Sequence, residues 1–261
     1  MTRPGPADSS SLWPREHGAY GELAFPIVSA LVLGRPTLAA IALGLAAILV
    51  FLAHEPMLVL VGRRGARRKT ESARPARVRL ALLGGLAVVL GGAGLAVAPR
   101  LATILALVPV AIGLVALGLA ATGRERSLGG ELHVALSLSS IALPVAIAAG
   151  LDLERAVSLV SVWAIGFGVS TGAARGLVFR GRDGGRLLRI TSIAAAAIVV
   201  AAIGLAAARV LLPGVALAPI PFAVLALGLR IRPPSPKQMS AVGYSLVGAS
   251  VVTLALLAFA S

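Results

Sequence analysis

Long apolar runs with almost no charge recur along this chain from its first helical segment to its end. The chain is 58% hydrophobic, and only 13% of its residues are Asp, Glu, Lys or Arg, whereas a soluble domain usually carries about 25%. Water would not tolerate so much unbroken apolar surface, but the hydrocarbon core of a bilayer would. The sequence therefore predicts an all-α, polytopic transmembrane helical bundle.

Nine apolar segments are candidates to cross a bilayer, which takes about 20 residues in a helix. The eighth is the weakest because it is short and holds Pro219 and Pro221; without it the count would be eight. We expect a polar cytoplasmic segment, residues 1–16, followed by a single transmembrane domain, residues 17–261. The nine predicted spans are His17–Gly34, Thr37–Val61, Val78–Ala98, Leu101–Thr122, Leu132–Ala149, Ala156–Phe179, Leu187–Ala208, Val215–Leu229 and Met239–Ala260.

The connections between these spans alternate in charge. The connection after the second span, Gly62–Arg79, holds eight basic residues, and those after the fourth, sixth and eighth spans are also basic. The other connections are short and nearly uncharged. Because cytoplasmic loops keep Lys and Arg, we expect a cytoplasmic N-terminus and a C-terminus outside. The net charge of +14 then indicates lipid headgroups as partners, and not nucleic acid.

Cysteine is absent from the chain, which excludes disulfides, thiolate metal sites and a cysteine nucleophile. The first thirteen residues are polar and show no cleavable signal peptide, so we expect the first apolar helix to act as the insertion signal. The 30 glycines indicate small-residue faces, which let membrane helices pack closely on one another or on a membrane protein partner.

A few polar residues lie where topology does not explain them, and such residues are costly at membrane depth. Each of the three histidines falls at a predicted cytoplasmic end of a span and has a glutamate one or two residues away. In a helix, Glu55 does not share a face with His54, so it should point to a neighbouring helix or an arginine. Ordinary helix-end polarity is the alternative: Glu131 could complement a helix dipole, and Arg175 could snorkel to the interface.

Together these residues suggest a polar cavity open to the cytoplasm. Guanidinium groups bind phosphate in a bidentate manner, and carboxylates with histidine bind a divalent metal or move protons. The candidate catalytic residues are Glu22, His54 and Glu55; the candidate substrate-binding residues are Arg15, His17, Arg63, Arg64, Arg175 and Arg180; the candidate metal ligands, for magnesium, are Glu16, Glu55 and Asp183.

Two motifs resemble those of the YwiC-like membrane proteins of bacteria. The first motif is Pro14-Arg15-Glu16-His17-Gly18-Ala19-Tyr20-Gly21-Glu22, with Phe25-Pro26 behind it. The second is Ala53-His54-Glu55-Pro56, followed by Gly62-Arg63-Arg64-Gly65. The resemblance is strong over the first two spans and extends in layout to the whole chain. It implies a multi-pass protein of the bacterial inner membrane, without pointing to a particular chemistry.

The layout also looks similar to that of the UbiA superfamily of intramembrane prenyltransferases. That resemblance implies nine helices, a cytoplasmic N-terminus and functional loops after the second and sixth spans, where aspartate-rich motifs hold magnesium and a prenyl diphosphate. The present chain departs from this pattern, because no N-D-x-x-D or D-x-x-x-D motif occurs in it. The likeness therefore supports the fold more than a prenyl-transfer activity.

Three functions remain open from the sequence. The first is a UbiA-like binder, or transferase, of an anionic lipid or isoprenoid diphosphate, in which Arg63, Arg64 and Arg180 hold the head. The second is a proton-coupled transporter of a small solute, and the third is a non-catalytic subunit of a membrane complex. The sequence leaves open whether the protein is an enzyme.

Overall fold

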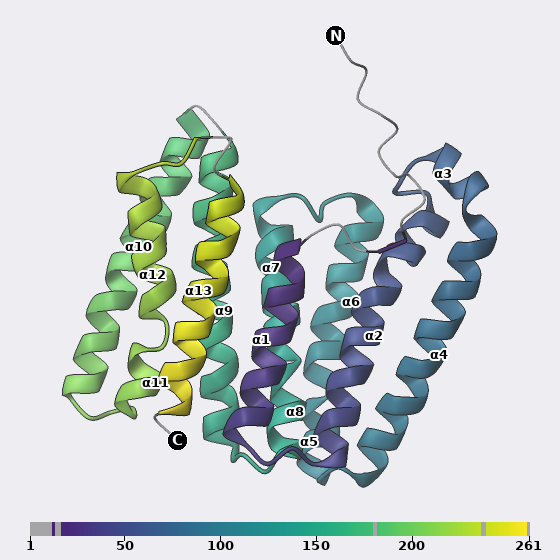
Figure 1. Cartoon of the computed structure of the whole chain (residues 1–261), viewed down its shortest axis with the longest axis horizontal. Helices are drawn as coiled ribbons and strands as arrows, with labels where there is room; N and C mark the ends of the chain where they lie inside the picture. Colours follow the sequence, from purple (N-terminus) through teal and green to yellow (C-terminus); the bar gives the residue numbers. More distant parts are fainter. Residues whose placement is uncertain (1–11, 14–16, 180–181, 236–238, 260–261) are drawn as a thin grey trace.

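A computed structural model describes residues 12–13, 17–179, 182–235 and 239–259 of the chain. All regular secondary structure in these described residues is helical, with no strand. The helices run side by side between the two ends of one bundle (Figure 1). Their bounds are α1 His17–Leu33, α2 Leu38–Val61, α3 Ala66–Glu71, α4 Ala73–Val97, α5 Arg100–Leu105, α6 Leu107–Thr122, α7 Leu128–Ser140, α8 Ala142–Ala148, α9 Leu153–Val178, α10 Arg182–Ala207, α11 Pro213–Leu217, α12 Ile220–Ile231 and α13 Met239–Ala258.

Eight helical segments of the described chain are long and apolar enough to cross a membrane. They are α2, α4, the pairs α5–α6, α7–α8 and α11–α12, and the helices α9, α10 and α13. These eight segments indicate a multi-pass membrane protein. The eighth predicted span, expected to be the weakest, is long and apolar enough to cross as Pro213–Ile231. Among the described residues, the shorter apolar helix is instead the first, α1, which ends at Leu33, one residue before the predicted end of its span.

Although α1 is short, it runs alongside α2 and α7 for most of the length of the bundle (Figure 1). At its far end the Arg35 N–H donates to the Ala149 carbonyl at 2.6 Å, and the Thr37 hydroxyl donates to the Ala148 carbonyl at 2.8 Å. Gly34 is required there, because a Cβ on it would overlap Ala149. These contacts fasten the α1–α2 turn to the end of α8.

A proline follows the break in each of the three interrupted spans. A proline inside a helix removes the hydrogen bond to the carbonyl four residues earlier and kinks the chain there. Pro109 follows the break between α5 and α6, Pro144 the break between α7 and α8, and Pro221 the break between α11 and α12. At the last break, the Thr253 hydroxyl of α13 donates to the Ala218 carbonyl at 2.9 Å.

The predicted loop after the second span is shorter than expected and largely helical. Residues Ala66–Glu71 form α3, and α4 begins at Ala73, five residues before the predicted start of the third span. Three arginines assigned to the loop therefore lie on the first turns of α4, namely Arg74, Arg77 and Arg79. Apolar content alone predicted neither α3 nor the early start of α4, because a helix can continue through polar residues once it leaves the bilayer.

The centre of the bundle is an aromatic cluster around Trp163 of α9, which is fully buried. Its indole stacks on Phe25 of α1 and on Phe167, with ring centroids 5.6 and 5.2 Å apart, and meets Phe222 of α12 edge-on at 6.0 Å. The indole Nε1–H donates to the Ser29 hydroxyl of α1 at 3.1 Å. This cluster joins α1, α9 and α12.

Candidate functional site

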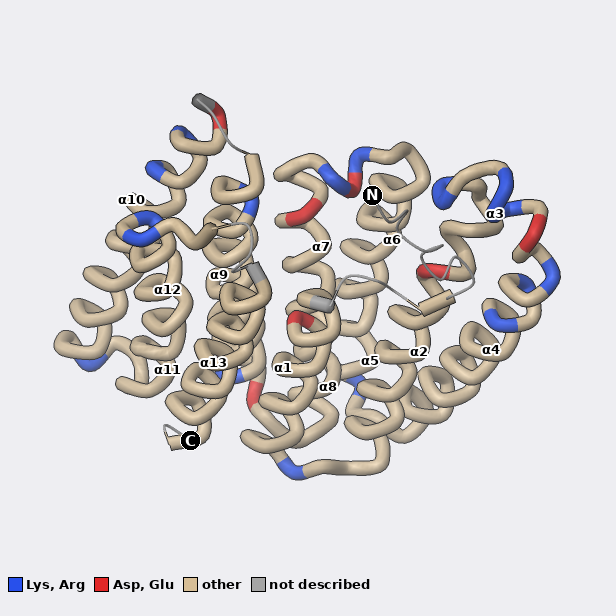
Figure 2. Tube along the Cα trace, turned by 45° about the horizontal axis from the view of Figure 1, so that its top comes forward, with Lys and Arg blue, Asp and Glu red and all other residues tan. Residues whose placement is uncertain are grey.

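Basic residues gather at one end of the bundle, at the end of Figure 2 where α3 lies. We call it the arginine-rich end; it comprises α3, the connections 62–65 and 123–127, and the adjoining ends of α2, α4, α9, α10 and α12. Among the described residues, the basic side chains at the opposite end are those of Arg35, Arg100, Arg155 and Arg209. The charge alternation predicted from the sequence is thus a segregation of charge to one end of the folded chain.

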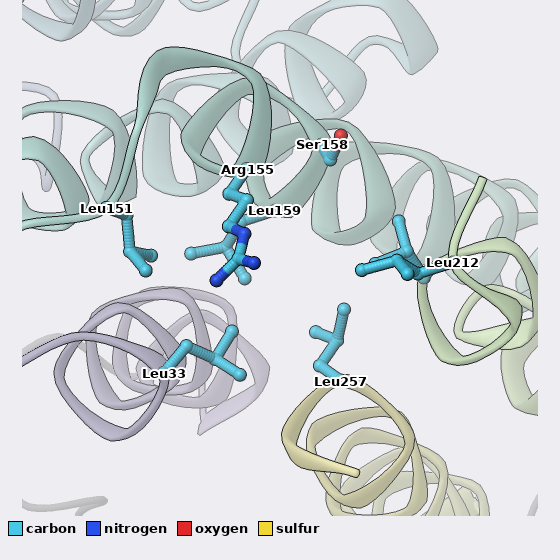
Figure 3. A pocket seen from close by; sticks show the side chains of 8 residues that line it. Leu33, Leu151, Arg155, Ser158, Leu159, Leu212 and Leu257 are labelled. Atoms are coloured by element: carbon cyan, nitrogen blue, oxygen red, sulfur yellow. The ribbon is translucent and has the colours of Figure 1, made fainter. Parts of the chain in front are cut away.

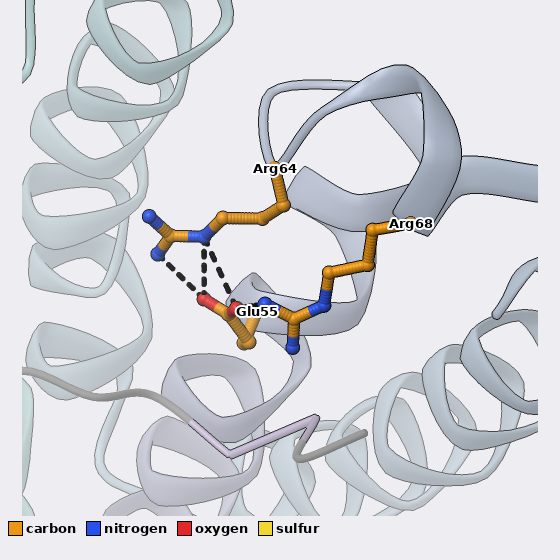
Figure 4. Close-up of polar contacts among 3 residues, drawn as sticks. All are labelled: Glu55, Arg64 and Arg68. Carbon is orange, nitrogen blue, oxygen red and sulfur yellow. Dashed lines mark hydrogen bonds and ion pairs between the residues drawn. The ribbon is translucent and has the colours of Figure 1, made fainter. Parts of the chain in front are cut away.

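The most buried charge at this end belongs to Glu55 of α2, whose side chain is 0% exposed. Arg64 clamps it: Nη2 lies 2.6 Å from Oε2, and Nε lies 3.0 Å from both carboxylate oxygens. Arg68 of α3 adds a longer contact, with Nη1 3.6 Å from Oε1. Figure 4 shows both guanidinium groups converging on the one carboxylate, that of Arg64 from the α2–α3 connection and that of Arg68 from α3.

Two glycines allow the chain to fold back over this carboxylate. Gly62 ends α2 with φ 87°, and Gly65 precedes α3 with φ 101°. Both have a positive φ, which residues with a Cβ rarely adopt. The reversal brings Arg64 and Arg68 back to Glu55, nine and thirteen residues earlier in the chain.

Three further segments contribute to this arrangement: residues 12–13, α1 and α4. The guanidinium carbon of Arg79 in α4 lies 4.1 Å from the ring centroid of Trp13, a cation–π contact. The Tyr20 hydroxyl of α1 lies within electrostatic reach of both Arg79 and Glu55. A small apolar cluster of Leu12, Val59 and Ala76 holds the same segments together. We call the set Glu55, Arg64, Arg68, Arg79, Trp13 and Tyr20 the Glu55 corner.

Arg63 points to a different part of the arginine-rich end. It reaches the end of α6, where a Cβ on Gly123 would overlap its guanidinium group. Gly123 caps α6 with φ 77°, so this position favours glycine for its backbone, and the exposed Arg63 side chain would have to move aside for a Cβ. A cation at a helix C-terminus also complements the helix dipole. Arg63 therefore ties the α2–α3 connection to the α6–α7 connection.

A second ion pair lies between α7 and α9. Nη1 of Arg175 is 2.5 Å from Oε1 of Glu131, and the Arg175 guanidinium carbon also lies 4.4 Å from the ring centroid of Phe179. Arg175 is 14% exposed and Glu131 36%. The pair joins the start of α7 to the end of α9 and is a contact separate from the Glu55 corner.

His133 of α7 has a structural partner. Its Nε2 lies 2.9 Å from the Ile112 carbonyl oxygen of α6, so the ring bridges α6 and α7. The regular pairing of histidine with glutamate in the sequence therefore does not mark one site: the His133 ring contacts a backbone carbonyl, while Glu131 contacts Arg175.

Comparison with known proteins places the chain in a family. The model of the family described as YwiC-like protein matches residues 13–147, more than half of the 261-residue chain. The chain belongs to the YwiC-like family. No curated protein and no solved structure matches it. The matched part of this YwiC-like protein includes α1–α7 and most of α8, and with them the whole Glu55 corner; Arg175 and Asp183 lie outside it.

The structure brings together some of the predicted site residues of this YwiC-like chain. Glu55 meets Arg64, which confirms the expectation that Glu55 points to an arginine. His54 is half-buried on α2, and Glu22 is half-buried on α1. Arg63 and Arg175 lie at the separate contacts described above, and Asp183 is exposed in the first turn of α10. His17 begins α1, and Arg15, Glu16 and Arg180 lie outside the described residues.

The predicted magnesium ligands do not form a cluster in the described part of the chain. Figure 1 places α2, which carries Glu55, and α10, which carries Asp183, on different sides of the bundle. Among the described residues, no group of three His, Asp or Glu side chains could hold a metal ion. Since Glu16 is not described, magnesium binding stays a prediction.

Sequence reasoning missed Arg68, Arg79, Trp13 and Tyr20 as parts of this corner. Arg68 could have been found, because it follows Arg64 by four residues and two glycines flank the turn that carries Arg64. Arg79 and Trp13 belong to segments 66 residues apart in the chain, and single-sequence patterns give no signal for a contact of that range.

Proposed function

We propose that this YwiC-like protein binds the phosphate-bearing head of an anionic membrane lipid, such as an isoprenoid diphosphate, at its arginine-rich end. The observation that carries the proposal is the Glu55 corner, where a buried carboxylate holds two guanidinium groups at the end of a membrane-spanning helix. Guanidinium N–H groups match phosphate oxygens in geometry and charge. A lipid has both the anionic head for such groups and the apolar tail for the surrounding helices.

The charge of the corner supports an anionic ligand. Residues 55–79 contain eight Lys or Arg and two Glu, and this excess adjoins apolar spans. Basic residues next to a membrane surface attract anionic lipids, by about 1 kcal/mol for each Lys or Arg. We propose that this end lies in the cytoplasm, as the positive-inside rule predicts, and that α1 forms a ninth span with the N-terminus on the same side.

Within the proposed site, Glu55 is a positioning residue. Its two carboxylate oxygens are engaged by Arg64 and Arg68, so its role is to hold these guanidinium groups in place for the ligand. His54, Glu22 and the more distant Arg63 and Arg175 stay predicted contacts. A UbiA-like layout and a magnesium-dependent transfer step belong to the same proposal, but the missing aspartate-rich motifs leave the transfer step without assigned residues.

Ligand-dependent unfolding tests the proposal. We would record thermal unfolding of the detergent-purified protein with farnesyl diphosphate, with and without magnesium. A ligand at 100 times its dissociation constant should add about 2.7 kcal/mol to native stability. Arg64→Gln should abolish the shift, whereas Arg67→Gln should keep it, because Arg67 is 89% exposed and pairs on the surface with Glu71. A shift that is absent in the wild type, or equal in both variants, would contradict the proposal.

A transporter is the second candidate, and the interrupted spans favour it. Substrate sites of many transporters lie at broken helices near the bilayer centre, and three spans of this chain are interrupted, one of them at Ile141 between α7 and α8. The serines near this break bond to carbonyls of their own helix: Ser139 donates to Ala135 at 2.8 Å and Ser140 to Ser137 at 2.7 Å. A pH-dependent solute flux in proteoliposomes would favour this function over lipid binding.

A further inference from the structure

A small cavity lies at the end of the bundle opposite the arginines, between α1, α9, α11 and α13. Its wall is almost entirely aliphatic and includes Leu33, Leu159, Leu212 and Leu257. One charged side chain lines it, that of Arg155 in the first turn of α9. Figure 3 shows the Arg155 guanidinium group pointing into the space between these leucines.

The position of Arg155 is not explained by the stability of α9. A cation in the first turn of a helix opposes the helix dipole, and Asp152 already caps this helix by accepting the Arg155 backbone N–H at 2.8 Å. The side chains of the two residues make a looser contact, with Nε 3.6 Å from Oδ2. Among the described residues, the two terminal nitrogens of Arg155 have no hydrogen-bond partner, so they can serve a ligand.

The size of the cavity indicates what kind of ligand would fit. Its volume is about 30 Å³, far below the several hundred Å³ of a pocket that encloses a whole small molecule. It can therefore receive only part of a ligand whose remainder lies elsewhere. Its four elements meet at the end of the bundle, at the depth where lipid headgroups contact a membrane protein. An aliphatic wall with one guanidinium group at that depth fits an acyl chain joined to a single negative charge.

We propose that this cavity binds one anionic phospholipid of the outer leaflet, with its phosphate on Arg155 and part of an acyl chain against Leu33, Leu159 and Leu257. The site is separate from the arginine-rich end and does not depend on lipid binding there; its assignment to the outer leaflet rests on the orientation proposed above. It would hold α13 to α1 and α9 through a lipid, at a place where the wall between these helices is incomplete.

Native mass spectrometry of the detergent-solubilised full chain tests this site, with titrations of the anionic lipid phosphatidylglycerol and the zwitterionic lipid phosphatidylcholine. We expect Arg155→Gln to weaken one phosphatidylglycerol binding step by on the order of tenfold, the effect of losing a charge-assisted hydrogen bond. Arg100→Gln is the matched control, because Arg100 also begins a helix at this end of the bundle but does not line the cavity. Lipid bound at the arginine-rich end should be unaffected by either change.

Two further arms make the result decisive. Leu212 is 49% exposed at the edge of the cavity, so Leu212→Trp should block the acyl chain without unfolding the protein and should weaken phosphatidylglycerol binding as well. Glycerol 3-phosphate, which has the phosphate but no chain, should not compete with the lipid. Equal affinity for the two lipids, equal loss in Arg155→Gln and Arg100→Gln, unchanged binding in Leu212→Trp, or competition by glycerol 3-phosphate would each overturn the proposal.

Discussion

A carboxylate that is fully buried at the end of α2 needs a cation beside it, because an unpaired charge at that depth is strongly unfavourable. Arg64 and Arg68 meet that need for Glu55. They also fix the turn between α2 and α3, since both are bound to a residue of the preceding helix. The corner is therefore a structural unit as well as the proposed ligand site.

Replacing Glu55 with Gln should destabilise the protein by about 3 kcal/mol, the usual scale for breaking a buried ion pair by removing one partner. The neutral amide can accept a hydrogen bond but leaves the charges of Arg64 and Arg68 poorly compensated. Equilibrium unfolding in mixed micelles would measure the effect. Glu71→Gln is the matched control, because its pair with Arg67 is exposed, and it should change stability little. Equal effects of the two changes would refute the structural role of Glu55.

Ser29 is the polar residue on which the aromatic centre depends. It is fully buried, accepts the indole N–H of Trp163 at 3.1 Å, and donates to the Phe25 carbonyl at 2.7 Å. Ser29→Ala leaves the indole donor buried without this acceptor, which should cost about 1–3 kcal/mol. Thermal unfolding followed by tryptophan fluorescence would show the loss. Ser161→Ala, on the exposed face of the same helix as Trp163, should have no comparable effect.

Among the elements, the end of α6 shows how one residue joins two connections. Gly123 has φ 77°, and Arg63 fills the space where a Cβ would lie. Gly123→Ala should destabilise the protein by about 1–2 kcal/mol, because a residue with a Cβ is disfavoured at this positive φ. Gly118→Ala, on the same helix but facing open space, should instead be neutral or stabilising by up to about 1 kcal/mol. The two substitutions should thus differ in sign in a denaturation experiment, and equal effects would contradict this account of Gly123.

For the whole molecule, the segregation of arginines predicts the orientation in the membrane. Because the chain has no cysteine, single cysteines can be introduced without background. Glu154→Cys, in the first turn of α9 at the opposite end, should react with a membrane-impermeant maleimide in intact cells. Arg67→Cys, in the exposed part of α3, should react only after the membrane is permeabilised. The reverse pattern would show that the arginine-rich end faces outward.

The sequence was sufficient for the features set by local composition. The apolar runs predicted each of the long helices, and the orientation of Glu55 away from His54 predicted a neighbouring helix or an arginine as its partner, of which the arginine is confirmed. Contacts between distant segments, such as Arg79 with Trp13 and Glu131 with Arg175, could not be predicted from the sequence. The eighth span was also wrongly expected to be the weakest, because Pro219 and Pro221 interrupt that segment without making it too short to cross, whereas the described part of α1 has 17 residues.

Photo-cross-linking tests most directly where an anionic lipid binds. A diazirine-bearing isoprenoid diphosphate would be irradiated with the protein in nanodiscs, and the modified peptides mapped by mass spectrometry. The account predicts adducts near the Glu55 corner, in α1, α2 or α4, that unlabelled farnesyl diphosphate suppresses and that Arg64→Gln reduces. Adducts confined to other helices, or unchanged by the competitor and by the substitution, would contradict lipid binding at this corner.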